Sequence, residues 1–307
     1  MKAFLSCFLS LILLPLLGHA KLNVVATLPD FAALAEAVGG DLVKVASLAK
    51  GTEDAHFVDA RPSFIRVLNQ ADVLIESGTD LEIGWLPPLI NSARNTKILP
   101  GQERRVALAR GIELLDVPSG PVDRSQGDVH ATGNPHYWLD PANGKIIAAH
   151  LAAVFARLDP ANASAYQTNL VQFTERLDRR LAAWSTRMAP GRGVKVLTYH
   201  KSYEYFARRF GLEIVGQLEP KPGLEPSATH INGLIARAKE QDVKLVLIEP
   251  FRPRKTPEYV AAEIGAKVIV LPDKVGGHQK VQDYLSLFDY AVEQITAALK
   301  KLEMMNR

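Results

Sequence analysis

Cysteine is almost missing from this chain of 307 residues, and the one cysteine, Cys7, lies inside an apolar run at the N-terminus. If that run is removed on export, the mature chain has no thiol, which excludes disulfides, thiolate metal sites and cysteine nucleophiles. Long basic runs are also missing. Loss of Lys2 with the leader lowers the formal net charge from +3 to +2, so nucleic acid is not an expected partner.

The first 20 residues have the order of a secretory signal peptide. Lys2 gives a positive start, residues 3–17 are almost continuously apolar, and residues 18–20 (Gly-His-Ala) place small residues where a signal peptidase cleaves. The apolar run is shorter than the roughly 20 residues of a membrane-spanning helix. Cys7 lies too early for a lipoprotein, whose cysteine stands at the cleavage point. We therefore expect a mature chain from Lys21, exported to the periplasm without a lipid anchor.

Removal of 20 residues from 307 leaves 287, a length that fits two domains or one large one. Short β-branched apolar runs alternate with amphipathic helical patterns, which is typical of parallel sheets covered by helices on both faces. The strand-like runs are 22–27, 44–49, 72–77, 195–199, 213–218, 244–248 and 267–271. The helical patterns between them are 30–38, 62–70, 202–210, 227–239 and 257–264.

The middle of the chain breaks this alternation with one long helical pattern between Pro160 and Met188. Its apolar residues recur at steps of three and four: Tyr166, Leu170, Phe173, Leu177, Leu181, Trp184 and Met188. At 1.5 Å per residue, such a helix is about 40 Å long. We therefore expect an α/β fold of two lobes, 21–158 and 189–307, each with a mainly parallel sheet flanked by helices. One long rigid helix, 159–188, joins them.

Three of the seven histidines of the mature chain stand where a strand pattern gives way to a helical one. His56 precedes the helical pattern at 62–70, His136 precedes the capping pair Asp140-Pro141, and His200 closes the strand-like run 195–199. Ligands bind at the carboxyl ends of parallel strands, and three converging imidazoles would form a transition-metal site. Each histidine taken singly is more typical of a solvated or capping residue, because the spacing matches no HxH or HExxH motif.

Several stretches, taken in order, resemble the zinc- and manganese-binding family of ABC transporter solute-binding proteins. They are 27–30 (TLPD), 56–63 (HFVDARPS), 71–75 (ADVLI), 134–141 (NPHYWLDP), 199–206 (YHKSYEYF), 225–227 (EPS), 248–250 (IEP) and 271–273 (LPD). The segment 134–141 is the most specific match. The resemblance covers essentially all of the mature chain, including the long central helix.

The resemblance implies that His56, His136, His200 and Asp273 are the metal ligands. Three imidazoles and one carboxylate suit zinc, with bonds of about 2.0–2.2 Å. Manganese is the alternative cargo, although manganese members of the family tend to use a further carboxylate instead of the third histidine, which favours zinc here. Glu249, at a strand end, is expected to orient an imidazole.

The remaining candidates are weaker. Glu53 and Asp54 are expected in a solvated loop, His150 and His230 to be structural or exposed, and His278 to lie in a polar loop. Many zinc-specific members of the family carry a long histidine-rich loop before the second ligand. Here the segment 116–134 is short and contains only His130, so a metal-scavenging role of this loop is absent or small. The segment 58–62 departs from the family's usual Glu-Pro-Thr-Pro ending, which leaves the fine selectivity open.

These features predict a monomeric binding protein, not an enzyme, that delivers zinc to the membrane permease of an ABC importer. A periplasmic metallochaperone is a further candidate partner. Three alternatives stay open: a manganese transporter component, a zinc chaperone or adhesin, and a zinc hydrolase with Glu249 or Glu53 as its base. The hydrolase is disfavoured because Asp273 would close the coordination position that a reactive water needs.

Overall fold

The computed structural model describes residues 21–122, 127 and 129–305, so the predicted signal peptide lies outside the described residues. Its first sheet is formed by β1 (Leu22–Ala26), β2 (Val43–Ser47), β3 (Val73–Glu76) and β4 (Arg105–Ala107). The strand order is β2-β1-β3-β4, and all three neighbouring pairs are parallel. Strand β4 was not predicted, because three residues are too few to show an apolar pattern.

The second sheet repeats this topology. It is formed by β5 (Lys195–Thr198), β6 (Glu213–Gln217), β7 (Leu245–Ile248) and β8 (Lys267–Val270). Its order is β6-β5-β7-β8, again parallel throughout. Every residue of β7 is buried, as expected for an apolar strand covered on both faces. In both sheets, parallel strands place their carboxyl ends, and the loops that follow, at one edge.

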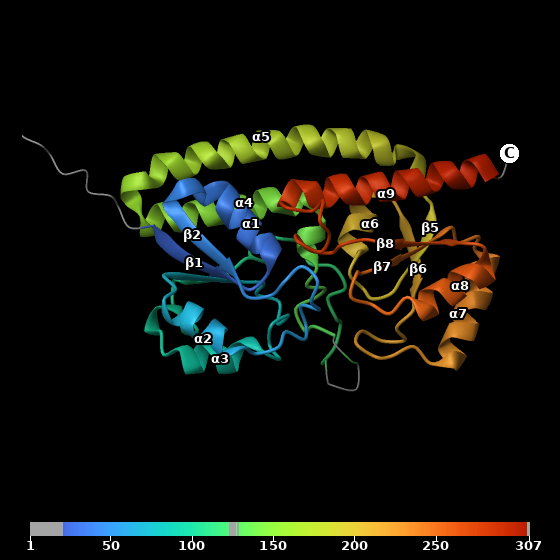
Figure 1. The fold of residues 1–307 in the computed structure, drawn as a ribbon, viewed down its shortest axis with the longest axis horizontal. Helices are drawn as coiled ribbons and strands as arrows, with labels where there is room; N and C mark the ends of the chain where they lie inside the picture. The colour runs from blue at the N-terminus through green and yellow to red at the C-terminus, as the bar shows by residue number, and fades with distance from the viewer. Residues whose placement is uncertain (1–20, 123–126, 128, 306–307) are drawn as a thin grey trace, which may run out of the picture.

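Helices cover both sheets, which confirms the expected α/β architecture. Around the first sheet lie α1 (Pro29–Gly39), α2 (Pro62–Asn69), α3 (Leu86–Ala93) and α4 (Pro141–Leu158). Around the second lie α6 (Glu204–Phe210), α7 (Ala228–Glu240) and α8 (Lys255–Ile264), with α7 and α8 at the far end of the molecule in Figure 1. Short 3₁₀ turns are η1 (Gly40–Leu42), η2 (Thr96–Ile98), η4 (Tyr137–Leu139), η5 (Pro160–Asn162) and η6 (Ala189–Gly191).

The long central helix is confirmed as α5 (Ala163–Met188), which follows the separate turn η5. It runs along the top of the molecule above both sheets, with the unpredicted C-terminal helix α9 (Tyr284–Met305) beside it (Figure 1). Trp184 of α5 packs against Phe288 of α9 with ring centroids 5.3 Å apart. Because α9 also contacts α1 and β8, two helices hold the halves before and after α5 together. The lobe boundaries at 158 and 189 stay a prediction.

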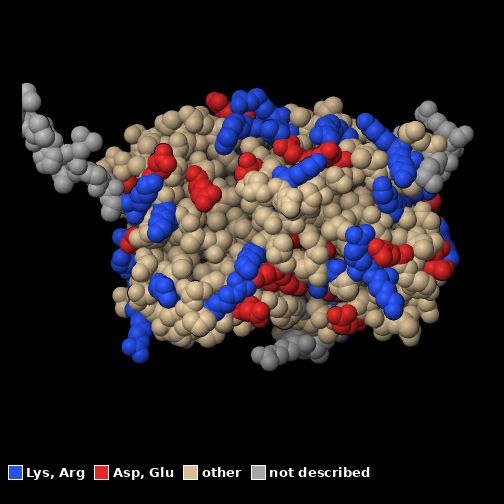
Figure 2. Space-filling view, viewed as in Figure 1, with Lys and Arg blue, Asp and Glu red and all other residues tan. Residues whose placement is uncertain are grey.

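One face of the molecule gives no sign of a dominant charge. On the face seen in Figure 2, Lys and Arg side chains are interspersed with Asp and Glu. Among the helices of the described residues, none combines the length and the apolar character needed to cross a membrane.

Candidate metal centre

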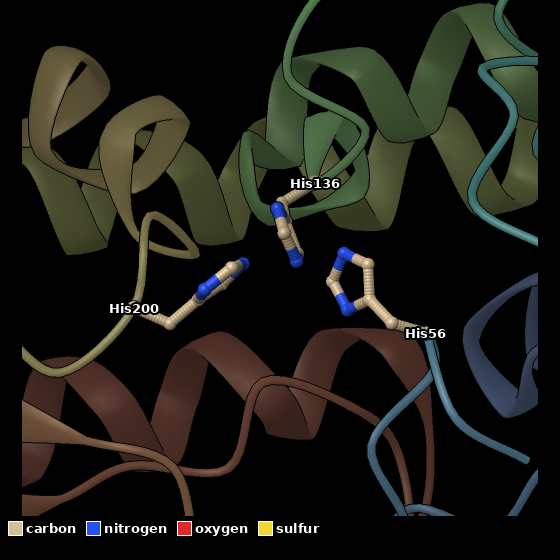
Figure 3. Close-up of side chains that lie close together, drawn as sticks. All are labelled: His56, His136 and His200. Carbon is tan, nitrogen blue, oxygen red and sulfur yellow. The ribbon is translucent and has the colours of Figure 1, made fainter. Parts of the chain in front are cut away.

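Three imidazoles meet between the two halves. His56 lies in the loop between β2 and α2, His136 immediately precedes η4, and His200 follows β5. Each offers one ring nitrogen, and these nitrogens lie within 4.8 Å of one another. The ring centroids are 5.1–5.3 Å apart, and Figure 3 shows the three rings facing a common point. The structure therefore brings together the three histidines that the sequence singled out.

His56 and His136 are held by residues of their own loops in the same way. The Oδ1 of Asp54 accepts a hydrogen bond from the His56 backbone N–H at 3.0 Å and lies 2.9 Å from its Nδ1. The Oδ1 of Asn134 makes the same pair of contacts to His136, at 3.0 and 2.9 Å. An acceptor at Nδ1 fixes the tautomer and leaves the Nε2 lone pair for a metal. The Nε2 of His56 is buried and has no hydrogen-bond partner in the described part of the chain.

His200 depends on a residue that the sequence analysis missed. Its Nδ1 lies 2.6 Å from Oε2 of Glu219, which follows β6. Glu249 does not orient an imidazole as expected, because its Oε1 accepts a hydrogen bond from Ser202 at 2.5 Å and its buried Oε2 accepts none from the described residues. The position of Glu219 at a strand end of the same sheet was the available signal, since such positions gather at one edge.

Burial and neighbouring charges shift the pKa values of His136 and His200 in opposite directions. Burial lowers the pKa of His136 well below its usual range, and the nearby His200 and His56 lower it further. Burial also opposes charge on His200, but the hydrogen bond and charge of Glu219 outweigh it and raise the pKa of that ring. A metal ligand must be a neutral imidazole, so a proton competes with cargo more strongly at His200 than at His136.

Asp273, the expected fourth ligand, is not part of the histidine cluster. Its Oδ2 pairs with the buried ammonium of Lys274, while its Oδ1 is buried with no hydrogen-bond partner among residues 21–122, 127 and 129–305. Its backbone oxygen accepts a hydrogen bond from Trp138 Nε1 at 2.8 Å, and the Trp138 ring lies 5.3 Å from that of His136. Asp273 is therefore beside the cluster, and its free oxygen would have to move toward the imidazoles to complete a tetrahedral set.

His130 lies closer to the cluster than the sequence suggested. Its ring centroid is 5.4 Å from that of His56, and its Nε2 is buried without a hydrogen-bond partner in the described chain. Burial, followed by the charges of His56 and His200, lowers the pKa of His130 to about 3. With His136 and His200 it lines a small cavity of about 100 Å³. His130 is thus a second candidate for the fourth position.

The other candidates have local roles. The Nε2 of His230 lies 2.9 Å from the backbone oxygen of Gln217, and the His278 ring packs 4.4 Å from that of Tyr290. His150 lies on α4. Glu53 pairs with Arg61 at the base of its loop. Asp54, in contrast, is not simply a solvated loop residue, because it orients His56.

Comparison with known proteins identifies the family of this chain. The model of the family described as "Zinc-uptake complex component A periplasmic" (ZnuA) matches residues 24–298. The chain belongs to this family.

Individual relatives of the ZnuA family differ in their cargo. The manganese ABC transporter substrate-binding lipoprotein PsaA of Streptococcus anginosus is 25% identical over 92% of this chain and 90% of its own length. The iron ABC transporter substrate-binding lipoprotein MtsA of Streptococcus pyogenes serotype M1 is 24% identical over 98% of this chain and 99% of its own. A zinc-bound ZnuA deletion mutant is 30% identical, with a TM-score of 0.75 over 91% of this chain and 98% of that one.

Membership of the ZnuA family decides between a binding protein and the zinc hydrolase that the sequence left open. The family consists of periplasmic solute-binding components of ABC importers, so the chain is not an enzyme and the hydrolase alternative falls. Its general partners follow from the same assignment, because such a component delivers its solute to a membrane permease served by an ATPase.

Proposed function

We propose that this protein captures a divalent transition metal in the periplasm, with zinc as the main cargo and manganese as the alternative, and delivers it to an ABC importer. The observation that carries the proposal is the convergence of His56, His136 and His200 within 4.8 Å. Each ring has its Nδ1 held by an oxygen acceptor, so Nε2 is the nitrogen available to the metal.

The choice of zinc rests on the ligand chemistry. Three imidazole nitrogens and at most one carboxylate suit tetrahedral zinc, whereas manganese favours more oxygen ligands. The relatives support both readings, since one is named for manganese and one similar structure holds zinc. Copper would bind three imidazoles more tightly than zinc in a test tube, so the cargo is set by availability as well as by affinity.

For the fourth position we propose Asp273, in line with the family resemblance. Its Oδ1 is buried and has no partner among the described residues, while Oδ2 can stay with Lys274. One carboxylate would offset part of the charge of the dication as it loses water. The ammonium of Lys274 keeps this carboxylate compensated before cargo arrives.

Calorimetry on metal-stripped residues 21–307 tests the function. We expect one tight zinc equivalent that is lost or greatly weakened in His136→Ala. The matched control is His230→Ala, which should leave binding unchanged. Its Nε2 contacts the Gln217 backbone oxygen, and it is not one of the three clustered histidines. Manganese titrated into the same sample, alone and in competition with zinc, ranks the two metals. Binding that is indifferent to His136 would refute the site.

The proposal also covers the oligomeric state of the protein and its export. We propose that it is exported by a cleaved signal peptide without a lipid anchor and acts as a monomer, with a periplasmic metallochaperone as a further candidate partner. The position of Cys7 inside the apolar run supports the missing anchor. The streptococcal relatives are named as lipoproteins, so the mature N-terminus has to be measured for this chain.

A further inference from the structure

Arg252 lies between the two halves of the molecule, close to the histidine cluster. It follows β7, and its side chain is 16% exposed. Its Nη2 is 3.3 Å from Oδ2 of Asp54, which belongs to the loop between β2 and α2 in the first half. Its Nη1 is 3.2 Å from Oε1 of Glu219, which follows β6 in the second half. One guanidinium therefore joins carboxylates from both halves.

Both carboxylates use their other oxygen to hold an imidazole. The Oδ1 of Asp54 lies 2.9 Å from Nδ1 of His56, and the Oε2 of Glu219 lies 2.6 Å from Nδ1 of His200. The polar side chains thus form a continuous path from His56 through Asp54, Arg252 and Glu219 to His200, with no step longer than 3.3 Å.

The guanidinium is held in place by further neighbours. It lies 5.1 Å from the ring centroid of Tyr199 and 5.2 Å from that of Phe251, within the range of cation–π contact. Its Nε is 3.7 Å from Oε2 of Glu249, an ion pair beyond hydrogen-bond length. A planar guanidinium held in this way presents Nη1 and Nη2 to two carboxylates in a fixed geometry, whereas the ammonium of a lysine would meet them less rigidly.

We propose that Arg252 is a positioning residue that couples the orientation of His56 to that of His200 across the two halves. The inference rests on the proposed metal site, because its effect is exerted on cargo held by these rings. Arg252 is also the cation that lies beside three carboxylates of this group, those of Asp54, Glu219 and Glu249.

Replacement of Arg252 tests the proposal, because an electrostatic role and a positioning role predict opposite changes in zinc affinity. In Arg252→Met the group around the imidazoles becomes more negative, so a purely electrostatic role predicts tighter binding of a dication. Loss of positioning predicts weaker binding and faster release. Loss of a partner that directly orients a ligand typically weakens binding 10–100-fold, and Arg252 acts one contact further out. We expect zinc to bind about tenfold more weakly and to dissociate correspondingly faster.

The experiment compares Arg252→Met, Arg252→Lys, Asp54→Asn and the double variant Asp54→Asn/Arg252→Met in the mature chain. Zinc affinity is measured by competition with a chelator, dissociation by stopped flow, and ligand geometry by the visible absorption of bound Co²⁺. Asn keeps an oxygen acceptor for His56 but removes the charge that Arg252 binds. We therefore expect the double variant to be no worse than Arg252→Met, and Arg252→Lys to recover part of the loss.

The matched control is Arg105→Met. The Arg105 side chain is 17% exposed and makes two hydrogen bonds to Glu76, at 2.7 and 2.8 Å, so its loss removes an equally buried ion pair away from the imidazoles. Tighter zinc binding in Arg252→Met, an unchanged Co²⁺ spectrum, or strictly additive effects in the double variant would overturn the inference. If Arg252→Met does not fold, a wild-type Co²⁺ spectrum and affinity in Asp54→Asn would overturn it instead. Failure of the unmodified protein to bind zinc would refute the proposed function and not this coupling.

Discussion

His200 Nδ1 and Glu219 Oε2 lie 2.6 Å apart, and both side chains are only 4% exposed. This contact differs from those of the other two imidazoles, whose acceptors stand two residues earlier in the same loop. His200 therefore relies on a separate strand end for its orientation. Like Asp54 beside His56, and unlike the amide of Asn134 beside His136, the carboxylate of Glu219 makes its ring a more basic ligand.

Replacement of Glu219 tests this dependence. Glu219→Gln should weaken zinc binding about 10–100-fold, because the ring loses a charged acceptor that fixes its tautomer. Titration of zinc against a competing chelator measures the effect. Glu249→Gln is the matched control, since Glu249 is equally buried but accepts from Ser202 and not from a ring. Equal losses in the two variants would mean that Glu219 has no special link to His200.

The fourth ligand can be decided between Asp273 and His130. Asp273→Asn should lower zinc affinity about tenfold or more, because the site loses its anionic oxygen donor. The metal-free variant should also unfold at a lower temperature, since the ammonium of Lys274 loses its partner. His130→Ala should change zinc affinity little. The reverse order of affinities would assign the fourth position to His130, whose Nε2 is buried and has no partner among the described residues.

Glu82 should make stability depend on pH. Burial raises the pKa of Glu82 from 4.5 to about 7, although its carboxylate accepts hydrogen bonds from Thr27 and Ser77. Folding then takes up a proton between these two pKa values, so stability is greatest below the lower one and declines as pH rises through the higher one. The loss at high pH is on the order of 3 kcal/mol.

Urea unfolding of the metal-free protein between pH 5 and 8.5 measures this dependence. Glu82→Gln should reduce the decline, because the amide stays neutral throughout. Asp30 and Glu204 should account for the remainder, since burial raises their pKa values to about 8 and about 7. Asp80→Asn is the control, since this carboxylate lines the same shallow pocket. A decline of the same size in Glu82→Gln would show that another group is responsible.

The predicted leader can be checked by mass. The protein recovered from the periplasm of an expressing cell should begin at Lys21 and carry no diacylglycerol. Intact-mass spectrometry gives both answers at once, and Cys7→Ser should leave the mature mass unchanged. A mature chain beginning at Cys7 with an added lipid mass would establish anchoring, as in the relatives named as lipoproteins.

The sequence predicted the parts of the site that local pattern can reveal. His56, His136 and His200 follow or precede recognisable strands and helices, and α5 carries its apolar stripe over many turns. The residues that orient the imidazoles were harder to predict, since Arg252 meets Asp54 only through the folding of the two halves against each other. Glu219 was overlooked and Glu249 was expected to orient an imidazole, although both stand at strand ends. Only the packing of the strands decides which of them faces the ring.

Two of the three imidazoles carry their orientation within three-residue units. In Asp54–His56 and in Asn134–His136, one side-chain oxygen binds both the backbone N–H and the ring of the histidine. In both units the acceptor stands in the same loop as the ring, whereas His200 takes its acceptor, Glu219, from a separate strand end. A protein that has just discharged its cargo would therefore keep two rings in register. Binding of the next metal ion would then restrict the rotation of little more than one side chain. This small entropic cost favours fast reloading at low metal concentration.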